Sequence, residues 1–265
     1  MSATIDNRTR PAEPAVAAAT LPRGVTTGHR LRRILLARWV GMRPMLVGYW
    51  IVMLVGFLIV GIGIKAATGG IDHSTWDYGT QSPKYFSMAV GIIITPAYLT
   101  LLVAQGITRR MMSVAVSIYL TGAAAATAVL WVLVYQVEHL IYDWQGWSQT
   151  LANPHLFTRT SQVGLIFAEF FLLILSHEVA GWLLGITFVR FGFWRGVLLL
   201  PLSLIPAAAA EFLLVAQWLA DVLNGLGYHR PPLAVAVPSV LVVSALGLYA
   251  GYLVLRPMAM KQAKG

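Results

Sequence analysis

Four stretches of the chain are long enough to cross a membrane as helices and contain no charged side chain. They cover residues 45–64, 85–108, 111–137 and 231–255, and none of them holds an Asp, Glu, Lys or Arg. An α-helix rises about 1.5 Å per residue, so about 20 residues span a hydrocarbon core of about 30 Å. These stretches therefore predict four transmembrane helices.

Two further stretches are apolar over a spanning length but carry acidic residues. Residues 160–189 contain Glu169, His177 and Glu178, and residues 196–220 contain Glu211. Inside lipid the backbone must satisfy its own hydrogen bonds, which favours helices where the alternating pattern of a barrel strand is absent. We therefore expect an all-α polytopic membrane protein with six transmembrane helices in residues 28–265.

The composition excludes an ordinary soluble domain. Of the 265 residues, 58% are hydrophobic and 11% are charged, whereas soluble domains average about 25% charged residues. The chain has no cysteine, which excludes disulfide bonds, thiolate nucleophiles and cysteine-based metal sites.

The net charge of +9 indicates topology and not nucleic-acid binding. With six spans, 15 of the 19 Lys and Arg residues fall on the side that holds both termini, and four fall on the other side. Basic residues that flank short loops are retained in the cytoplasm. Both termini should therefore be cytoplasmic in a multi-pass protein of the cell (plasma) membrane, with membrane lipid and no nucleic acid among its partners.

The N-terminal region divides into two parts. Residues 1–27 lack an apolar core segment, which predicts a disordered cytoplasmic tail without a cleavable signal. Residues 28–44 predict an amphipathic helix in the inner membrane interface, or alternatively a plain basic anchor next to the first span. Its apolar face would include Trp39, with three arginines pointing away from it: Arg30, Arg32 and Arg33.

Motifs for catalysis or nucleotide binding are absent from the sequence. It contains no GxxxxGK[ST], GxGxxG or GxSxG pattern. His177 and Glu178 begin like the zinc motif HExxH, but Gly181 and Trp182 follow where the second histidine would stand. We expect no metal site and no catalytic residue in this chain. The histidines assigned to the outer side are expected to be solvated or capping residues: His73, His139, His155 and His229.

The acidic residues inside the spans are the strongest candidates for a functional site. Helix geometry places Glu178 about 16 Å, His177 about 18 Å and Glu211 about 22 Å from the inner boundary, so these groups could meet at mid-depth. They would either line a polar pathway or hold neighbouring helices together by hydrogen bonds. Glu169 should lie near the outer surface, where it needs no special role.

The short loop between the second and third spans resembles a known family pattern. Its sequence, QGITRRMM over residues 105–112, is similar to the G-[STV]-[ST]-R-[RK] pattern of ABC-2 type permeases, the transmembrane subunits of ABC exporters whose ATPase is commonly a separate chain. In that family the loop forms a helix that couples to the ATPase. The resemblance assigns this role to four residues: Gly106, Thr108, Arg109 and Arg110.

The resemblance implies further expectations. The chain would pair with a separate ABC ATPase and with a second permease half, as a homodimer or heterodimer. ATP and magnesium would bind to the ATPase, so this chain would bind no cofactor and would not be an enzyme itself. The apolar spans favour an apolar or amphipathic exported substrate such as a lipid, a drug or a peptide antibiotic.

Two other functions remain open on the sequence alone. A proton-coupled secondary carrier would use Glu178, His177 and Glu211 and would need no ATPase. Inverted repeats would favour such a carrier, and the sequence displays none. A membrane sensor or assembly subunit without transport activity is the third possibility.

Overall fold

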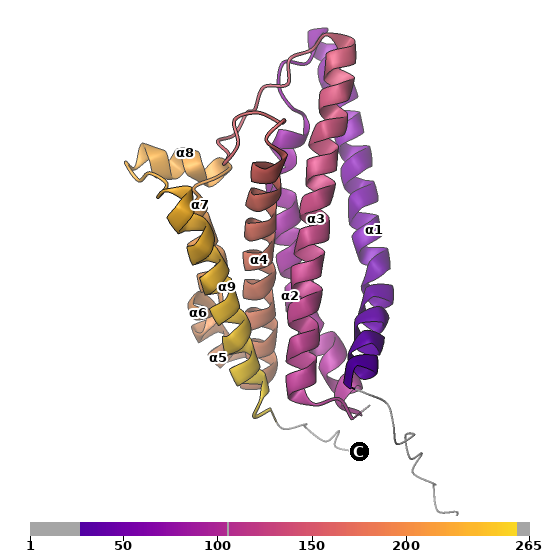
Figure 1. The fold of residues 1–265 in the computed structure, drawn as a ribbon, viewed down its shortest axis with the longest axis vertical. Helices are drawn as coiled ribbons and strands as arrows, with labels where there is room; N and C mark the ends of the chain where they lie inside the picture. The colour runs from indigo at the N-terminus through magenta and orange to yellow at the C-terminus, as the bar shows by residue number, and fades with distance from the viewer. Residues whose placement is uncertain (1–26, 105, 259–265) are drawn as a thin grey trace, which may run out of the picture.

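The computed structural model describes residues 27–104 and 106–258, which form helices and no β-strand (Figure 1). The predicted all-α fold is confirmed for these residues. The elements are α1 (Thr27–Thr68), η1 (Trp76–Gly79), α2 (Gln81–Ala104), α3 (Arg109–Gln145), α4 (Val163–Phe191), α5 (Phe193–Leu198), α6 (Leu200–Ser203), α7 (Ile205–Leu214), α8 (Trp218–Gly225) and α9 (Leu233–Leu255).

Several of these helices are long and apolar enough to cross a membrane. Among the described residues, α1, α3, α4 and α9 meet both criteria, and α7 with α8 would add a fifth span if the bent pair is counted as one. Helix α2 has 24 residues, a length of about 36 Å. The architecture is therefore that of a helical membrane protein.

Helix α4 lies at the centre of the bundle. Every residue from Leu172 to Thr187 is buried, because α2, α3, α7 and α9 all pack around it. A helix with apolar residues on every side belongs in such a position, and its few polar side chains must find partners there. Its contact with α2 is the most extensive in the bundle, and it depends on glycine: a Cβ atom at Gly181 or Gly185 would overlap the α2 backbone, and one at Gly91 would overlap the α4 backbone.

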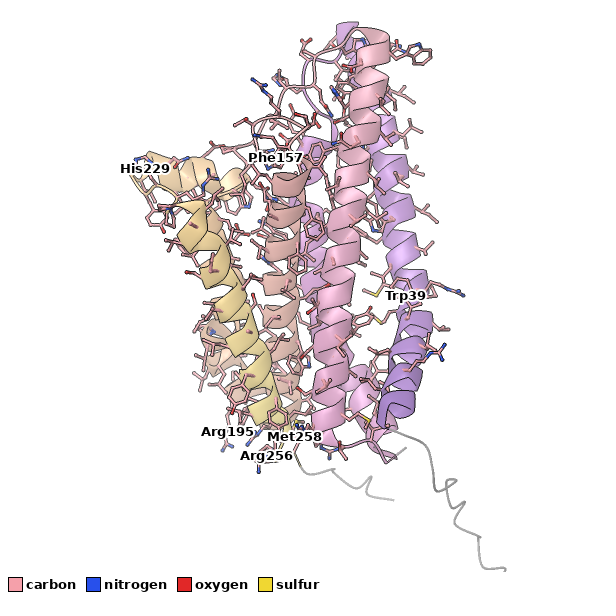
Figure 2. All side chains as sticks on the ribbon, in the orientation of Figure 1. Trp39, Phe157, Arg195, His229, Arg256 and Met258 are labelled. Carbon is pink, nitrogen blue, oxygen red and sulfur yellow. The ribbon has the colours of Figure 1, made fainter. Side chains whose placement is uncertain are left out.

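The two ends of the bundle differ in chemistry. One end holds the start of α1, the α2–α3 turn, the α4–α5 junction and the end of α9, and we call it the basic end (Figures 1 and 2). There Arg109 donates a hydrogen bond to the carbonyl of Met258 at 3.1 Å, and Arg190 donates to the carbonyl of Val254 at 2.6 Å. The opposite end, the loop end, holds η1, α8 and the connection 146–162.

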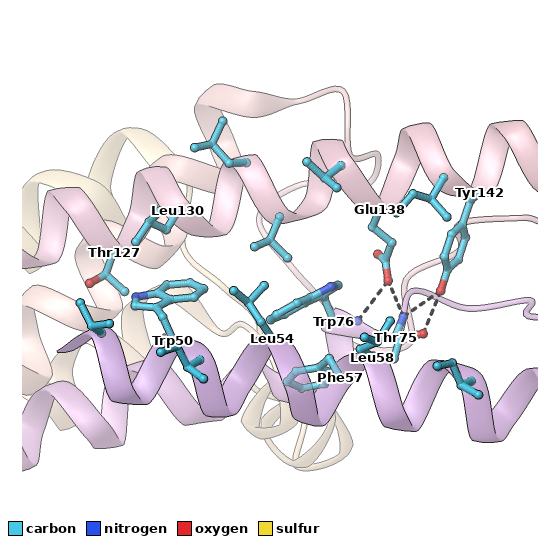
Figure 3. A pocket seen from close by; sticks show the side chains of 18 of the residues that line it. Trp50, Leu54, Phe57, Leu58, Thr75, Trp76, Thr127, Leu130, Glu138 and Tyr142 are labelled. Atoms are coloured by element: carbon cyan, nitrogen blue, oxygen red, sulfur yellow. Dashed lines mark hydrogen bonds between the residues drawn. The ribbon is translucent and has the colours of Figure 1, made fainter. Parts of the chain in front are cut away.

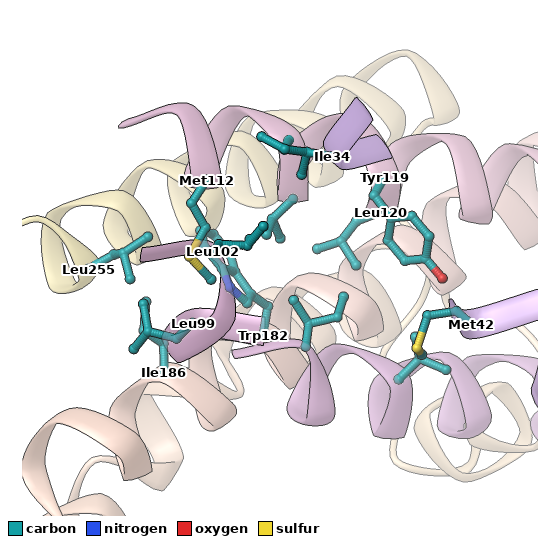
Figure 4. Close-up of a cluster of buried hydrophobic side chains, with 14 of the residues drawn as sticks. Ile34, Met42, Leu99, Leu102, Met112, Tyr119, Leu120, Trp182, Ile186 and Leu255 are labelled. Atoms are coloured by element: carbon teal, nitrogen blue, oxygen red, sulfur yellow. The ribbon is translucent and has the colours of Figure 1, made fainter. Parts of the chain in front are cut away.

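The predicted separate interfacial helix is not observed. Residues 28–44 continue through Pro44 into the first apolar stretch as one helix of 42 residues. Ile34 and Met42 on its expected apolar face are buried against the bundle, while Arg32 and Trp39 are exposed (Figures 2 and 4). Packing against protein thus replaces part of the expected contact with lipid. The side chains of Arg30 and Arg33, and the predicted tail over residues 1–26, lie outside the described residues.

The predicted fifth span, residues 196–220, is not one regular helix. It is divided among α5, α6, α7 and α8. The interruptions at Leu199 and Leu204 each lie two residues before a proline, Pro201 and Pro206. Proline cannot donate the backbone hydrogen bond that a helix interior needs, so it weakens the helix there. Helix α7 then ends at Val215, which has a φ of 42°, and α8 turns away by 69°. A positive φ is incompatible with a right-handed helix, so α7 cannot continue past this residue. The conformation is also unfavourable for a β-branched residue.

Candidate functional site

Two clusters of buried charged side chains surround the loop-end half of α4. The first, which we call the ion-pair cluster, consists of Lys84 on α2, His177 on α4 and Glu211 on α7. The Lys84 ammonium forms an ion pair with Glu211 Oε1, and His177 Nε2 lies 3.5 Å from that same oxygen. All three residues are buried. A buried lysine is stable only where its charge is paired, so these contacts fix α2 and α7 against α4.

The hydrogen bonding of His177 constrains its proton. Nδ1 lies 2.8 Å from the carbonyl oxygen of Leu173, and a carbonyl oxygen only accepts, so Nδ1 carries a hydrogen. In the neutral ring, Nε2 would then present a lone pair toward the Glu211 carboxylate. An additional proton on either group would convert this contact into a hydrogen bond, so the cluster has a place for one proton.

Only part of the predicted polar group meets. His177 and Glu211 lie together, whereas Glu178 is turned toward Ser87 of α2. Adjacent helix residues point about 100° apart, which accounts for the separation. One Glu178 oxygen has no hydrogen-bond partner among the described residues. Glu178 is therefore placed between α2 and α4 and outside the ion-pair cluster.

The second cluster, the carboxylate–histidine cluster, consists of Asp77, His155 and Glu169. His155 Nε2 lies 2.5 Å from Asp77 Oδ1, and His155 Nδ1 lies 2.7 Å from Glu169 Oε1. Because each ring nitrogen faces an acceptor, the arrangement suits a doubly protonated imidazolium. The other bonds to the two carboxylates come from backbone N–H groups and side chains: Ala152 N, Asn153 N, Asn153 Nδ2, Tyr135 Oη, Leu156 N and Gln217 Nε2.

These contacts shift the pKa values of the two loop-end residues. Burial alone would lower the pKa of His155, but the charges and hydrogen bonds of Glu169 and Asp77 outweigh it and raise the pKa to about 10. Burial would raise the pKa of Asp77, but its bonds with His155 and with two backbone N–H groups outweigh burial and lower the pKa. His155 and Asp77 are thus held in their charged forms around neutral pH.

Gln217 connects the bend between α7 and α8 to both clusters. Its amide donates to Glu169 at 3.3 Å and accepts from Gln81 Nε2 at 2.9 Å, one helical turn before Lys84. Its backbone N–H donates to the carbonyl of Pro154 at 2.5 Å. The residue is fully buried with a φ of 61°. The bend is therefore held by specific polar contacts.

The α2–α3 turn at the basic end is capped on both sides. Gly106 has a φ of 74° and ends α2, and the N–H of Ile107 bonds to the carbonyl of Leu102 at 3.0 Å, which is the Schellman arrangement. Thr108 is the N-cap of α3 and accepts a hydrogen bond from Met111 N at 3.2 Å. Helix capping thus explains the glycine and the threonine of the motif.

The two arginines of the turn differ from each other. Arg109 is half-buried and bonds to the end of α9, so its guanidinium is partly used within the chain. Arg110 is exposed. Of the two arginines that the motif singles out, Arg110 is therefore the more available to a partner.

Several polar residues of the site were missed by the sequence interpretation. Glu169 and His155 were expected near the surface and in solvent, but both are buried and paired. Lys84 precedes an apolar stretch, where a snorkelling lysine is ordinary, and nothing local points to its partner 127 residues away. Glu138 was placed in a loop after residue 137, but α3 continues to Gln145 and carries it.

The described residues contain no group of three or more His, Asp or Glu side chains arranged to hold a metal ion. Comparisons of the chain with protein-family models, curated proteins and solved structures find no match.

Proposed function

We propose that this chain is the transmembrane subunit of an ATP-driven exporter of the ABC-2 type. In this proposal α1, α2, α3, α4, the segment α5–α7 and α9 make six spans, and the basic end faces the cytoplasm. The observation that carries the proposal is the exposed Arg110 next to a doubly capped turn at the basic end.

A turn of this kind suits docking to a motor protein. Gly106 and Thr108 cap the two helices that it joins, which reduces the conformational freedom lost when a partner binds. The guanidinium of Arg110 can form two parallel hydrogen bonds with a carboxylate on the partner. Arg109 ties the same turn to the end of α9, so a force on the turn would reach a second span.

The short connections at the basic end support a separate ATPase. Helix α2 ends at Ala104 and α3 begins at Arg109, and a single residue separates α4 from α5. These connections are too short to fold a nucleotide-binding domain. ATP and magnesium would therefore be held by a partner ATPase, and a second permease half, identical or different, would complete the transporter.

Purification of the tagged full-length chain from its own membranes in mild detergent tests this proposal. The expected result is a co-purifying protein with a phosphate-binding loop and ATP hydrolysis by the complex. Arg110→Ala should reduce both, whereas Arg195→Ala, which removes an exposed arginine at the same end, should not. Purification of the chain without an ATPase, and without ATP hydrolysis, would contradict the proposal.

The ion-pair cluster favours a second candidate function, a proton-coupled carrier. Lys84 and His177 both approach one oxygen of Glu211, and the contact between His177 and Glu211 can accept a proton. Buried ionisable groups in spans often mark proton pathways. In that case, uptake or release of protons by the purified chain in vesicles should depend on His177 and should not require ATP.

A further inference from the structure

The strongest unexplained feature of the molecule is an apolar groove between α1 and α3. Its volume is about 900 Å³, within the range of small-molecule sites. Figure 3 shows Trp50 of α1 opposite Leu130 of α3, and Leu58 of α1 further along the groove near Glu138 of α3. Helix α1 packs loosely against α3, so the side chains of the two helices leave this space open.

The shape of the groove limits what can occupy it. The lining residues on α1 run from Trp39 to Lys65, a distance of about 39 Å. The groove is therefore long for its volume of about 900 Å³, and its lining is almost wholly apolar. A flexible hydrocarbon chain, which packs at about 3.5–4.0 Å from its carbon neighbours, can follow such a groove.

Polar groups gather at one end of the groove. Lys65, Thr75, Glu138 and Tyr142 line it at the loop end, together with Trp147. Tryptophan and tyrosine at such a position are typical of the level of lipid headgroups. An occupant with an apolar tail and a polar head would therefore place its head at the loop end.

Lys65 favours an anionic head at that end, because the acidic residue of the lining is already bonded within the chain. The Glu138 carboxylate already accepts hydrogen bonds from Thr75 N at 2.8 Å and from Trp76 N at 3.2 Å (Figure 3). It also accepts from Gln149 Nε2 at 2.8 Å and from Ser74 Oγ. Lys65 is exposed and forms no ion pair among the described residues.

The Lys65 ammonium lies 5.1 Å from the centre of the Trp147 ring. This contact holds the ammonium at the groove mouth while leaving donors free for a phosphate. We propose that the α1–α3 groove binds a membrane phospholipid, with an acyl chain between the helices and an anionic phosphate at Lys65. The lipid completes the packing of α1, and the site is independent of the transport mechanism proposed above.

The test measures phospholipid retained by the purified full-length chain. The protein is reconstituted into vesicles of equal parts phosphatidylglycerol and phosphatidylcholine, extracted in mild detergent and examined by native mass spectrometry. Retained lipid should be enriched in phosphatidylglycerol. Lys65→Gln should reduce this enrichment about fivefold, since one basic residue near an anionic surface contributes about 1 kcal/mol. The exposed loop-end variant Arg159→Gln should leave the enrichment unchanged.

A second pair of variants tests the groove itself. Leu130→Trp fills the groove and should reduce retention of both lipids at least several-fold. Leu241→Trp changes a similarly exposed leucine on α9, at 42% against 39% for Leu130, and should have no effect. Equal losses from Lys65→Gln and Arg159→Gln would overturn the headgroup assignment. Unchanged retention in Leu130→Trp would overturn the groove assignment, as would loss of a dimer in that variant without loss of lipid.

Discussion

Lys84 of α2 and Glu211 of α7 form an ion pair in which the lysine side chain is 1% exposed. Removing one member leaves the other charge buried and uncompensated, which costs about 3–5 kcal/mol in proteins. We therefore expect Lys84→Met to lower the thermal unfolding midpoint strongly in detergent. The double variant Lys84→Met/Glu211→Leu should recover most of the loss. A double variant less stable than Lys84→Met alone would contradict a direct pairing.

The carboxylate–histidine cluster should make stability depend on pH. The pKa of His155 is about 10, above its ordinary value of 6.5, so its contribution is complete below about pH 6.5 and is lost as the pH rises toward 10. The pKa of Asp77 is lowered, so its contribution is present above its ordinary pKa of 3.8 and is lost in stronger acid. The unfolding midpoint should fall from about pH 7 to pH 10, and less so in His155→Gln. Parallel curves for the two proteins would show that another group is responsible.

Close packing of α2 on α4 predicts a sharp effect of one methyl group. A Cβ at Gly181 would overlap the backbone of Met88, and overpacking typically costs about 1–3 kcal/mol. Gly181→Ala should lower the unfolding midpoint measurably. Gly122→Ala on α3 is the matched control, because no atom lies within 4 Å of the added group; it should be neutral or slightly stabilising. Equal changes of the unfolding midpoint in the two variants would indicate that helix propensity, and not the α2–α4 contact, determines the effect.

The helices could be predicted from the sequence because each apolar stretch carries its own signal. Their irregularities had weaker signals. Pro201 and Pro206 mark the breaks around α6, but the end of α7 depends on left-handed Val215 and Gln217, which are not glycine. The tertiary contacts of Gln217 hold that bend, and no local pattern could reveal them.

The sequence predicted only that part of the candidate site that depends on how far each residue lies from the membrane boundary. The meeting of His177 and Glu211 followed from their similar distance to one boundary. Lys84 and His155 were missed because each is buried through contacts with carboxylates far away in sequence: 127 residues to Glu211 and 78 to Asp77. Pairing of this kind is set by the packing of whole helices and loops.

The proposed orientation predicts the location of inserted reporters. Fifteen of 19 basic residues lie on the side of the termini when six spans are assumed. A reporter fused after Gly265 should be active only in the cytoplasm. One inserted at exposed Gly146, which ends α3 at the loop end, should be active only outside. The reverse pattern would overturn the orientation and with it the docking role of the α2–α3 turn.

The most direct test of the exporter proposal is site-specific photocrosslinking at the α2–α3 turn. A photoreactive amino acid replaces exposed Val114, one helical turn after Arg110, in the full-length chain in its native membrane, and a second protein carries it in place of exposed Arg195. The account predicts a crosslink from position 114 to a protein with a phosphate-binding loop, identified by mass spectrometry, and little or none from position 195. Crosslinks to lipid alone from position 114, in membranes that retain active transport, would contradict the account.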